Sequence, residues 1–139
     1  MQKIILISCS STKLDHIAKA KNLYISPLFK YNLKYAQSFS PAKIFILSAK
    51  YGLLSLEQEI EPYNETLNKA TDSQIKDWAE KVIVSLQKET NLVQDEFVFL
   101  AGEKYRRHLV PRLVNYSIPM KGMLIGEQLS YLKNKFSNY

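Results

Sequence analysis

Three short apolar runs, each followed at once by polar residues, limit most strongly what this chain can fold into. The runs cover residues 3–8, 44–47 and 96–100 and consist largely of Ile, Leu, Val and Phe. Nearly continuous runs of this kind are typical of strands buried on both faces of a parallel sheet. The sequence therefore predicts a single α/β domain over residues 1–139. We expect three α/β/α layers, a mostly parallel sheet of about four strands, and a ligand site at the C-terminal edge of the sheet.

The polar residues that follow the apolar runs are the candidate ligand-binding groups. They are Cys9, Ser10, Ser11 and Lys13 after the first run, Ser48, Lys50 and Tyr51 after the second, and Gly102 and Tyr105 after the third. Hydroxyl groups, ammonium groups and the backbone N–H groups of such loops bind anions and sugars. The alternative is that these segments are ordinary polar turns, which need no ligand.

Capping residues predict where the main helices begin. Ser26 is a good N-cap and Pro27 suits the first helical position, so we expect a helix from there to about Phe39. Thr71 and Gln74 form a capping box at the start of a strongly amphipathic helix, whose buried stripe includes Trp78 and ends at Leu86. Each helix connects two of the apolar runs, so β-α-β units with right-handed crossovers are expected.

The remaining segments predict less regular structure. Residues 14–22 are polar and basic, and we expect a mobile loop there. Tyr105, Leu109 and Leu113 share one face of a predicted helix, although Pro111 must kink or end it. A last helix is expected near the C-terminus, with apolar residues facing inward at Leu129, Leu132 and Phe136.

Composition narrows the functional class. The only cysteine is Cys9, which excludes an internal disulfide and a cysteine-rich zinc site. His16 and His108 have no partner at metal-ligand spacing, so neither a metal nor a cofactor is predicted. The N-terminal apolar run is too short for a signal sequence or a membrane span, and we expect a cytoplasmic protein. A net charge of +6 favours attraction to phosphates, although the basic residues are spread along the chain.

Candidate catalytic groups come from the acidic segment 57–65 and from the C-terminal helix. A loop carrying Glu61 and Tyr63 would bring a carboxylate and a phenol to the sheet edge that carries Lys50. Carboxylate-assisted cleavage of a glycosidic bond needs one such acid or base, for which Glu61 and Glu127 are the candidates. Cys9 is either a nucleophile or a buried structural thiol. A serine hydrolase is poorly supported, because the G-x-S-x-G pattern is absent.

The order of short motifs resembles an uncharacterised bacterial and phage domain family, itself distantly similar to YaaA-type proteins and to the uracil-DNA-glycosylase-like α/β fold. The motifs are C-S-x-x-K, L-Y-x-S-P-L-F, L-S-A-K-x-G-L-L, E-P-Y, A-G-x-x-Y and G-x-x-I-G-E-Q-L-x-x-L. The matching positions are Cys9, Ser10, Lys13, Tyr24, Ser26, Ser48, Lys50, Glu61, Tyr63, Gly102, Tyr105, Gly126 and Glu127. The resemblance implies that the ligand is a nucleobase, a nucleotide or a nucleic acid.

Two functions are therefore expected from the sequence. The first is an enzyme that acts at the N-glycosidic bond of a nucleotide or of a base in DNA. In it, Lys50 and the loop of residues 10–13 hold phosphate or sugar, Tyr51 or Tyr63 contacts the base, and a glutamate transfers protons. The second is a non-catalytic nucleic-acid-binding module, which the net charge of +6 supports directly.

Overall fold

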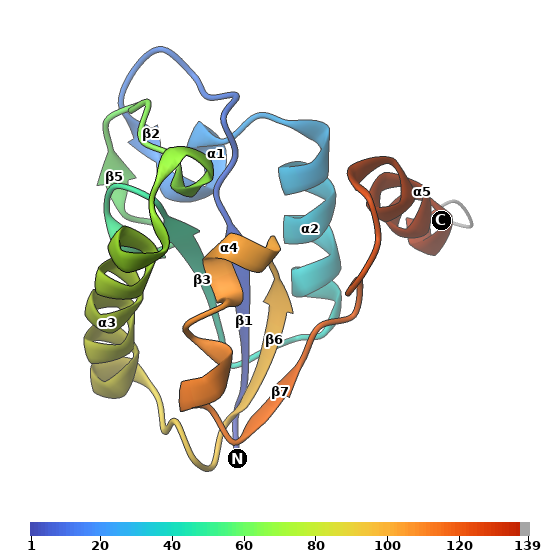
Figure 1. Ribbon diagram of the computed structural model, residues 1–139. Helices are drawn as coiled ribbons and strands as arrows, with labels where there is room; N and C mark the ends of the chain where they lie inside the picture. The colour runs from blue at the N-terminus through green and yellow to red at the C-terminus, as the bar shows by residue number, and fades with distance from the viewer. Residues whose placement is uncertain (137–139) are drawn as a thin grey trace.

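The computed structural model describes residues 1–136, whose main sheet has five strands (Figure 1). The strands are β1 (Lys3–Ser8), β3 (Lys43–Ser48), β4 (Gly52–Ser55), β6 (Glu96–Leu100) and β7 (Asn115–Ser117). Their order is β4-β3-β1-β6-β7, and only the pairing of β4 with β3 is antiparallel. The predicted α/β fold with a mostly parallel sheet is confirmed, and the sheet has one strand more than expected.

The additional strands lie at the two edges of the sheet and have weak sequence signals. β4 begins at Gly52, whose φ of 74° turns the chain back along β3. β7 has three residues, all exposed, so no apolar run marks it in the sequence. β7 is held by its pairing with β6 rather than by burial, and an apolar pattern misses it, whereas β4 buries Leu54.

Residues 14–17 are irregular, whereas residues 18–22 do not form the loop that their polar, basic composition predicts. Strand β2 (Ala18–Lys19) pairs antiparallel with β5 (Glu59–Ile60) in a small second sheet, and helix α1 (Ala20–Leu23) follows. Ala20 and Leu23 are fully buried. The prediction of a loop was wrong because these small and apolar side chains bury themselves against residues far along the chain, while the lysines between them stay at the surface.

The two capped helices form as predicted. Helix α2 (Pro27–Ser38) starts after Ser26, whose side chain accepts a hydrogen bond from the N–H of Phe29. Helix α3 (Asp72–Glu89) starts with a complete capping box between Thr71 and Gln74. Both helices begin where the capping residues place them.

The C-terminal third is made of shorter pieces. It contains α4 (Glu103–Arg106), the 3₁₀ turn η2 (Val110–Arg112) and helix α5 (Ile125–Phe136). Another 3₁₀ turn, η1 (Leu67–Lys69), lies earlier in the chain, before α3. The predicted helix through Tyr105 and Leu113 is therefore divided, with Pro111 inside η2. Tyr105, Leu109 and Leu113 nevertheless share one buried cluster, as their spacing indicated. On α5, Leu132 is fully buried.

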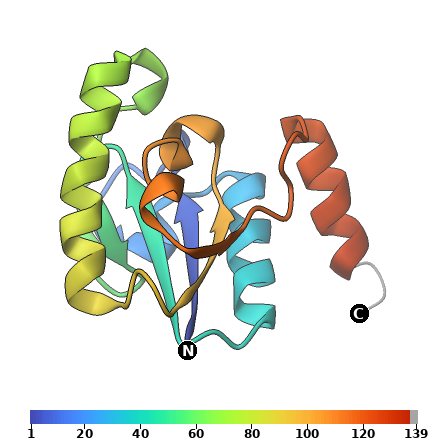
Figure 2. The same cartoon turned by 60° about the horizontal axis from the view of Figure 1, so that its bottom comes forward.

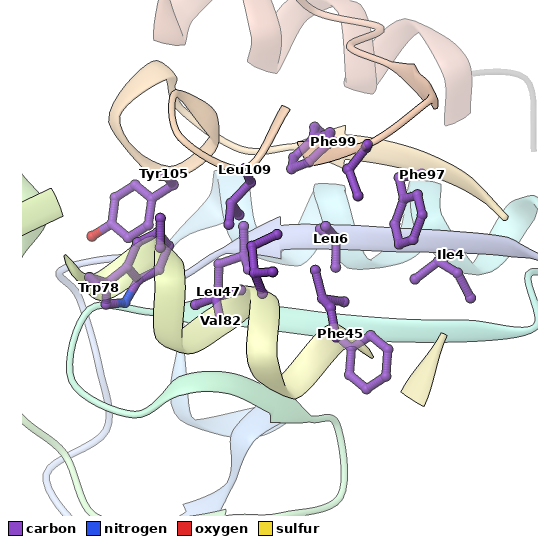
Figure 3. Packing of buried hydrophobic residues seen from close by; sticks show 14 of the residues in the cluster. Ile4, Leu6, Phe45, Leu47, Trp78, Val82, Phe97, Phe99, Tyr105 and Leu109 are labelled. Carbon is purple, nitrogen blue, oxygen red and sulfur yellow. The ribbon is translucent and has the colours of Figure 1, made fainter. Parts of the chain in front are cut away.

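Buried side chains form one cluster on each face of the sheet. Alternate residues of β1 divide between them: Ile4 and Leu6 pack towards α3, and Ile5 and Ile7 pack towards α2. Figure 2 shows α3 on one side of the sheet and α2 with α5 on the other. Figure 3 shows the first cluster, in which Trp78 of α3 lies beside Tyr105.

Within residues 1–136, no helix combines the length and the apolar character that a membrane span requires.

Candidate functional site

The strand order places a topological switch point at the C-terminal ends of β1 and β6. From β1 the chain crosses through α2 to β3 on one side, whereas from β6 it crosses to β7 on the other side. Ligands of open parallel sheets bind where neighbouring connections leave in opposite directions, because a crevice opens there. The two segments that flank this point, residues 9–13 and 101–105, are two of the three polar exits noted in the sequence.

Cys9 and Tyr105 join these two exits directly. The Cys9 thiol donates a hydrogen bond to the Tyr105 hydroxyl over 3.5 Å, and Cys9 itself is half-buried. The Tyr105 hydroxyl also accepts from the N–H of Leu67, and its ring meets Trp78 edge to face, with 5.7 Å between ring centres. Burial and the nearby charge of Cys9 raise the pKa of Tyr105 well above its ordinary value. Tyr105 is therefore a neutral, fixed hydrogen-bonding group.

A chain of buried hydroxyl groups follows the exit of β3. The Ser48 hydroxyl accepts from the N–H of Tyr51 and donates to the Tyr63 hydroxyl over 2.8 Å. The Tyr63 and Tyr24 oxygens lie 2.6 Å apart. Because Tyr63 accepts from Ser48, its own proton is available to Tyr24. Burial is the main reason that the pKa values of Tyr24 and Tyr63 are raised far above their ordinary value, so both phenols stay protonated.

Lys13 places a partly desolvated ammonium group beside these phenols. Its Nζ lies 4.4 Å from the centre of the Tyr63 ring and 5.8 Å from that of Tyr24. Burial lowers the pKa of Lys13, while the charges of Cys9 and Glu65 oppose that shift. We call Cys9, Lys13, Tyr24, Ser48, Tyr63 and Tyr105 the switch-point site. All six were candidate ligand-binding residues from the sequence.

Other sequence candidates lie at the rim of this site or serve the local backbone. Ser10 donates to the carbonyl of Thr12, and Ser26 caps α2. Ser11 and Lys50 are exposed. The Tyr51 ring meets the Tyr63 ring edge to face, with 5.5 Å between centres. Tyr51 therefore borders the site.

Glu61, Glu127 and Gly126 make their contacts outside the six residues of the switch-point site. The backbone carbonyl of Glu61, not its exposed carboxylate, accepts a 3.5 Å hydrogen bond from Tyr51. The Glu127 carboxylate accepts from the N–H of Leu124 and so caps the first turn of α5. Gly126 borders a shallow hollow together with Glu127 and Met123. Glu127 thus has a structural task that explains its place at a helix start.

Gly102 borders a second cavity, of about 370 Å³, between the exit of β6 and the segment before α5. The cavity is also lined by Arg106, whose guanidinium donates to the carbonyl of Ala101 over 2.8 Å, and by Met120. Neither hollow includes Cys9 or Lys13 among its lining residues. Within the switch-point site the polar side chains bond one another, Cys9 to Tyr105 and Ser48 to Tyr63 to Tyr24.

Trp78 and Glu65 are residues of this region that the sequence reasoning did not select. Trp78 was predicted as core, and it is buried, but its indole N–H also donates to the carbonyl of Ser48 over 2.8 Å. The need of a buried indole for a partner was an available signal. Glu65 acts on Lys13 through its charge. Nothing in the acidic segment distinguished it from Glu61 in advance.

In the part of the chain that the structure describes, no three His, Cys, Asp or Glu side chains are grouped as a metal ion would require.

Comparisons with known proteins identify the family of this chain and nothing further. No curated protein and no solved structure matches the chain. Residues 4–134 match DUF6884, a family of unknown function, and the chain belongs to that family.

Proposed function

We propose that the switch-point site binds a nucleotide or another ligand that contains a nucleobase. The observation that carries this proposal is the Lys13 ammonium, held over the Tyr63 ring and partly removed from water. A desolvated cation gains more from an anionic ligand than a solvated one does, because the surrounding dielectric is lower. A phosphate at Lys13 would compensate for the lost water and raise the pKa of the ammonium group again.

The phenols suit the rest of such a ligand. Tyr24 and Tyr105 are neutral hydroxyl groups that can donate to a sugar or to a base without a charge penalty. Tyr51 and Lys50 at the rim add a ring and a second cation, with Nζ of Lys50 5.3 Å from the Tyr51 ring centre. An aromatic ring beside cations favours a ligand that combines phosphate with a planar base.

We further propose that the reaction is hydrolysis at an N-glycosidic bond, following the resemblance to the uracil-DNA-glycosylase-like fold and to YaaA-type proteins. In this step the C1′–N bond breaks and water forms a new C1′–O bond. The base leaves with the electron pair and receives a proton, and water passes its proton to a carboxylate. Glu65 joins Glu61 and Glu127 as a candidate for that carboxylate, because its charge acts on Lys13.

The finer architectural and cellular expectations belong to the same proposal. We class the fold as three-layer α/β/α, since α3 and α2 pack against opposite faces of the sheet. We assign a cytoplasmic location on the ground that the single cysteine is free.

A ligand screen tests the binding proposal. Thermal unfolding of the full chain is measured with nucleobases, nucleosides and nucleotides, since a ligand that binds the folded state raises the midpoint. We expect a rise with a nucleotide that is lost in Lys13→Met and kept in Lys69→Met, a control at another exposed lysine. No rise with any compound, or an equal rise in Lys13→Met, would overturn the proposal.

Product analysis tests the reaction. Release of free base from the ligand found in the screen is followed by chromatography for the wild type and for Glu61→Gln, Glu65→Gln and Glu127→Gln. We expect Glu65→Gln to lose most activity and Glu127→Gln to lose least. Unchanged base release in all three variants would exclude the carboxylate mechanism.

A further inference from the structure

Helices α2 and α5 form a surface rich in lysine and poor in acid. They pack together on one side of the sheet (Figures 1 and 2). Lys30 and Lys34 of α2 are exposed, and α2 contains no acidic residue. Lys133 and Lys135 near the end of α5 are also exposed, and the single acidic residue of α5 is Glu127 in its first turn. We call Lys30, Lys34, Lys133 and Lys135 the α2–α5 surface, in which Lys133 and Lys135, two positions apart, lie on different sides of α5.

Within residues 1–136, no carboxylate lies within ion-pair distance of these four lysines. Among residues 1–136, none of the ion pairs involves a residue of α2 or α5. Lys30 and Lys34 are four residues apart in one helix, so they lie on the same face and repel each other. This arrangement weakens the isolated helix slightly. Its charge therefore serves something other than the stability of the fold.

Aromatic rings alternate with the lysines. Nζ of Lys34 lies 4.5 Å from the centre of the Phe136 ring, which brings a cation of α2 to the end of α5. Nζ of Lys135 lies 5.0 Å from the centre of the Tyr131 ring. Both rings are half-exposed. Lysines that follow a phosphate backbone, with rings on which bases stack, are the combination that binds single-stranded nucleic acids.

The start of α2 lies close to the switch-point site. Tyr24 of that site lies two residues before Ser26, the cap of α2, and the N–H of Ile25 donates to the carbonyl of Thr12 in the loop after β1. Lys30 follows in the first turns of the same helix. A chain bound along α2 and α5 would therefore reach the exit of β1.

We propose that the α2–α5 surface binds the backbone of a single-stranded nucleic acid, so that the ligand of the switch-point site is a nucleotide within a polynucleotide chain. The second half of this statement rests on the proposed function, whereas the surface itself does not. An anionic membrane is the other polyanion to consider. It is less favoured because the exposed apolar residues Leu124 and Ile125 lie at the start of α5 and the lysines lie at its end.

Fluorescence anisotropy with a labelled 20-nucleotide oligothymidylate tests the surface directly. For four phosphate contacts, log K should fall against log salt with a slope of about −3. Lys34→Glu/Lys135→Glu should weaken binding at least tenfold at about 150 mM salt and reduce the slope by about 1.4, since two contacts are lost. The matched control is Lys81→Glu/Lys88→Glu on α3, which changes net charge equally and should alter affinity less than threefold.

Each remaining outcome decides between the surface and the site. Equal loss in both double variants would show a non-specific charge effect and overturn the surface, as would equal or tighter binding of a duplex of the same length. Binding to vesicles containing an anionic phospholipid, without binding to the oligonucleotide, would replace the nucleic acid by a membrane. If a mononucleotide raises the unfolding midpoint but the oligonucleotide does not bind, this inference is rejected and the proposed function is kept. If the oligonucleotide binds equally well to Lys13→Met and no mononucleotide raises the midpoint, the α2–α5 surface is kept and the proposed function is rejected.

Discussion

Helix α3 covers one face of the sheet, and helices α2 and α5, which carry the α2–α5 surface, cover the other. The two sides differ in whether their charged side chains form ion pairs. On α3, Asp72 pairs with Arg107 at 2.7 Å, and Glu80 pairs with Arg112 at 2.6 Å. Glu89 at the end of α3 pairs with Lys43. On α2, two lysines occupy neighbouring turns without a carboxylate. Both helices bury an apolar stripe of similar character, so their contribution to the core does not account for the difference.

The two sides differ in whether the spacing of their charged residues stabilises the helix. Opposite charges four residues apart, such as Asp77 and Lys81 in α3, support a helix by a few tenths of a kcal/mol, and like charges weaken it by as much. The α3 side follows the favourable pattern. The α2 side departs from it, and this departure is the ground on which we propose that the surface binds a polyanionic ligand.

The largest expected effect concerns the core, where the two sides should behave alike. Trp78→Ala should lower the free energy of unfolding by about 3–5 kcal/mol, because a buried ring and its hydrogen bond to Ser48 are lost, and Phe29→Ala on α2 should cost a similar amount. Urea denaturation measures both. Val84→Ala, at an exposed position of α3, is the control and should change stability by less than about 0.5 kcal/mol. A small effect of Phe29→Ala alone would break the equivalence of the two cores.

Alkaline pH should destabilise both sides through their buried phenols. The pKa values of Tyr24, Tyr63 and Tyr105 are raised in the folded protein, so these phenols keep their protons when the unfolded chain loses them near its ordinary pKa of 10.0. Their contribution to stability is complete below pH 10 and is lost as pH rises above it. Absorbance at 295 nm should show exposed tyrosines ionising first and these three only with unfolding, as followed by circular dichroism. Ionisation of all nine tyrosines before unfolding would contradict their burial.

The hydroxyl chain should have a moderate effect. Tyr63→Phe removes the oxygen that joins Ser48 to Tyr24 and should destabilise the protein by about 1–3 kcal/mol, because a buried hydroxyl loses its partner. Tyr116→Phe is the matched control, since Tyr116 is 46% exposed, and it should be close to neutral. If both substitutions were neutral by urea denaturation, the hydroxyl chain would not be a structural unit.

The smallest expected effect tests the comparison most directly, because the change in stability should have opposite signs in the two helices. Lys30→Glu creates a favourable Glu-to-Lys pair with Lys34 and should stabilise by about 0.2–0.5 kcal/mol. Lys81→Glu places like charges at positions 77 and 81 of α3 and should destabilise by a similar amount. Midpoints measured in low and high salt check both, and the difference should shrink in high salt. Equal signs would remove the contrast between the faces.

Local signals sufficed wherever a residue acts on its neighbours in the chain. Ser26 and Thr71 fixed the starts of α2 and α3, since a cap bonds backbone groups two or three residues away. Alternating burial placed Ile4 and Ile5 on opposite faces of β1. The same reasoning failed for residues 18–22, where β2 forms by pairing with β5 about 40 positions later, and for β7, which has no buried residue.

The candidate site divides in the same way. Cys9, Lys13, Ser48 and Tyr105 were recognisable because each follows an apolar run, and a strand exit is a local feature. Glu127 was recognisable as a carboxylate but not as the cap of α5, because that task depends on where the helix begins. Glu65 gained its relation to Lys13 only through folding of the acidic segment.

The sequence by itself determined the buried strands, the capped helices, the polar exits and the excess of positive charge, because periodicity, capping and composition act over a few residues. Only the tertiary structure decided the order β4-β3-β1-β6-β7, and with it the switch point between β1 and β6. It also decided which lysines meet a carboxylate and which do not. Such pairings join residues as far apart as Cys9 and Tyr105, which are separated by 96 positions, and no local pattern specifies which distant segments become neighbours.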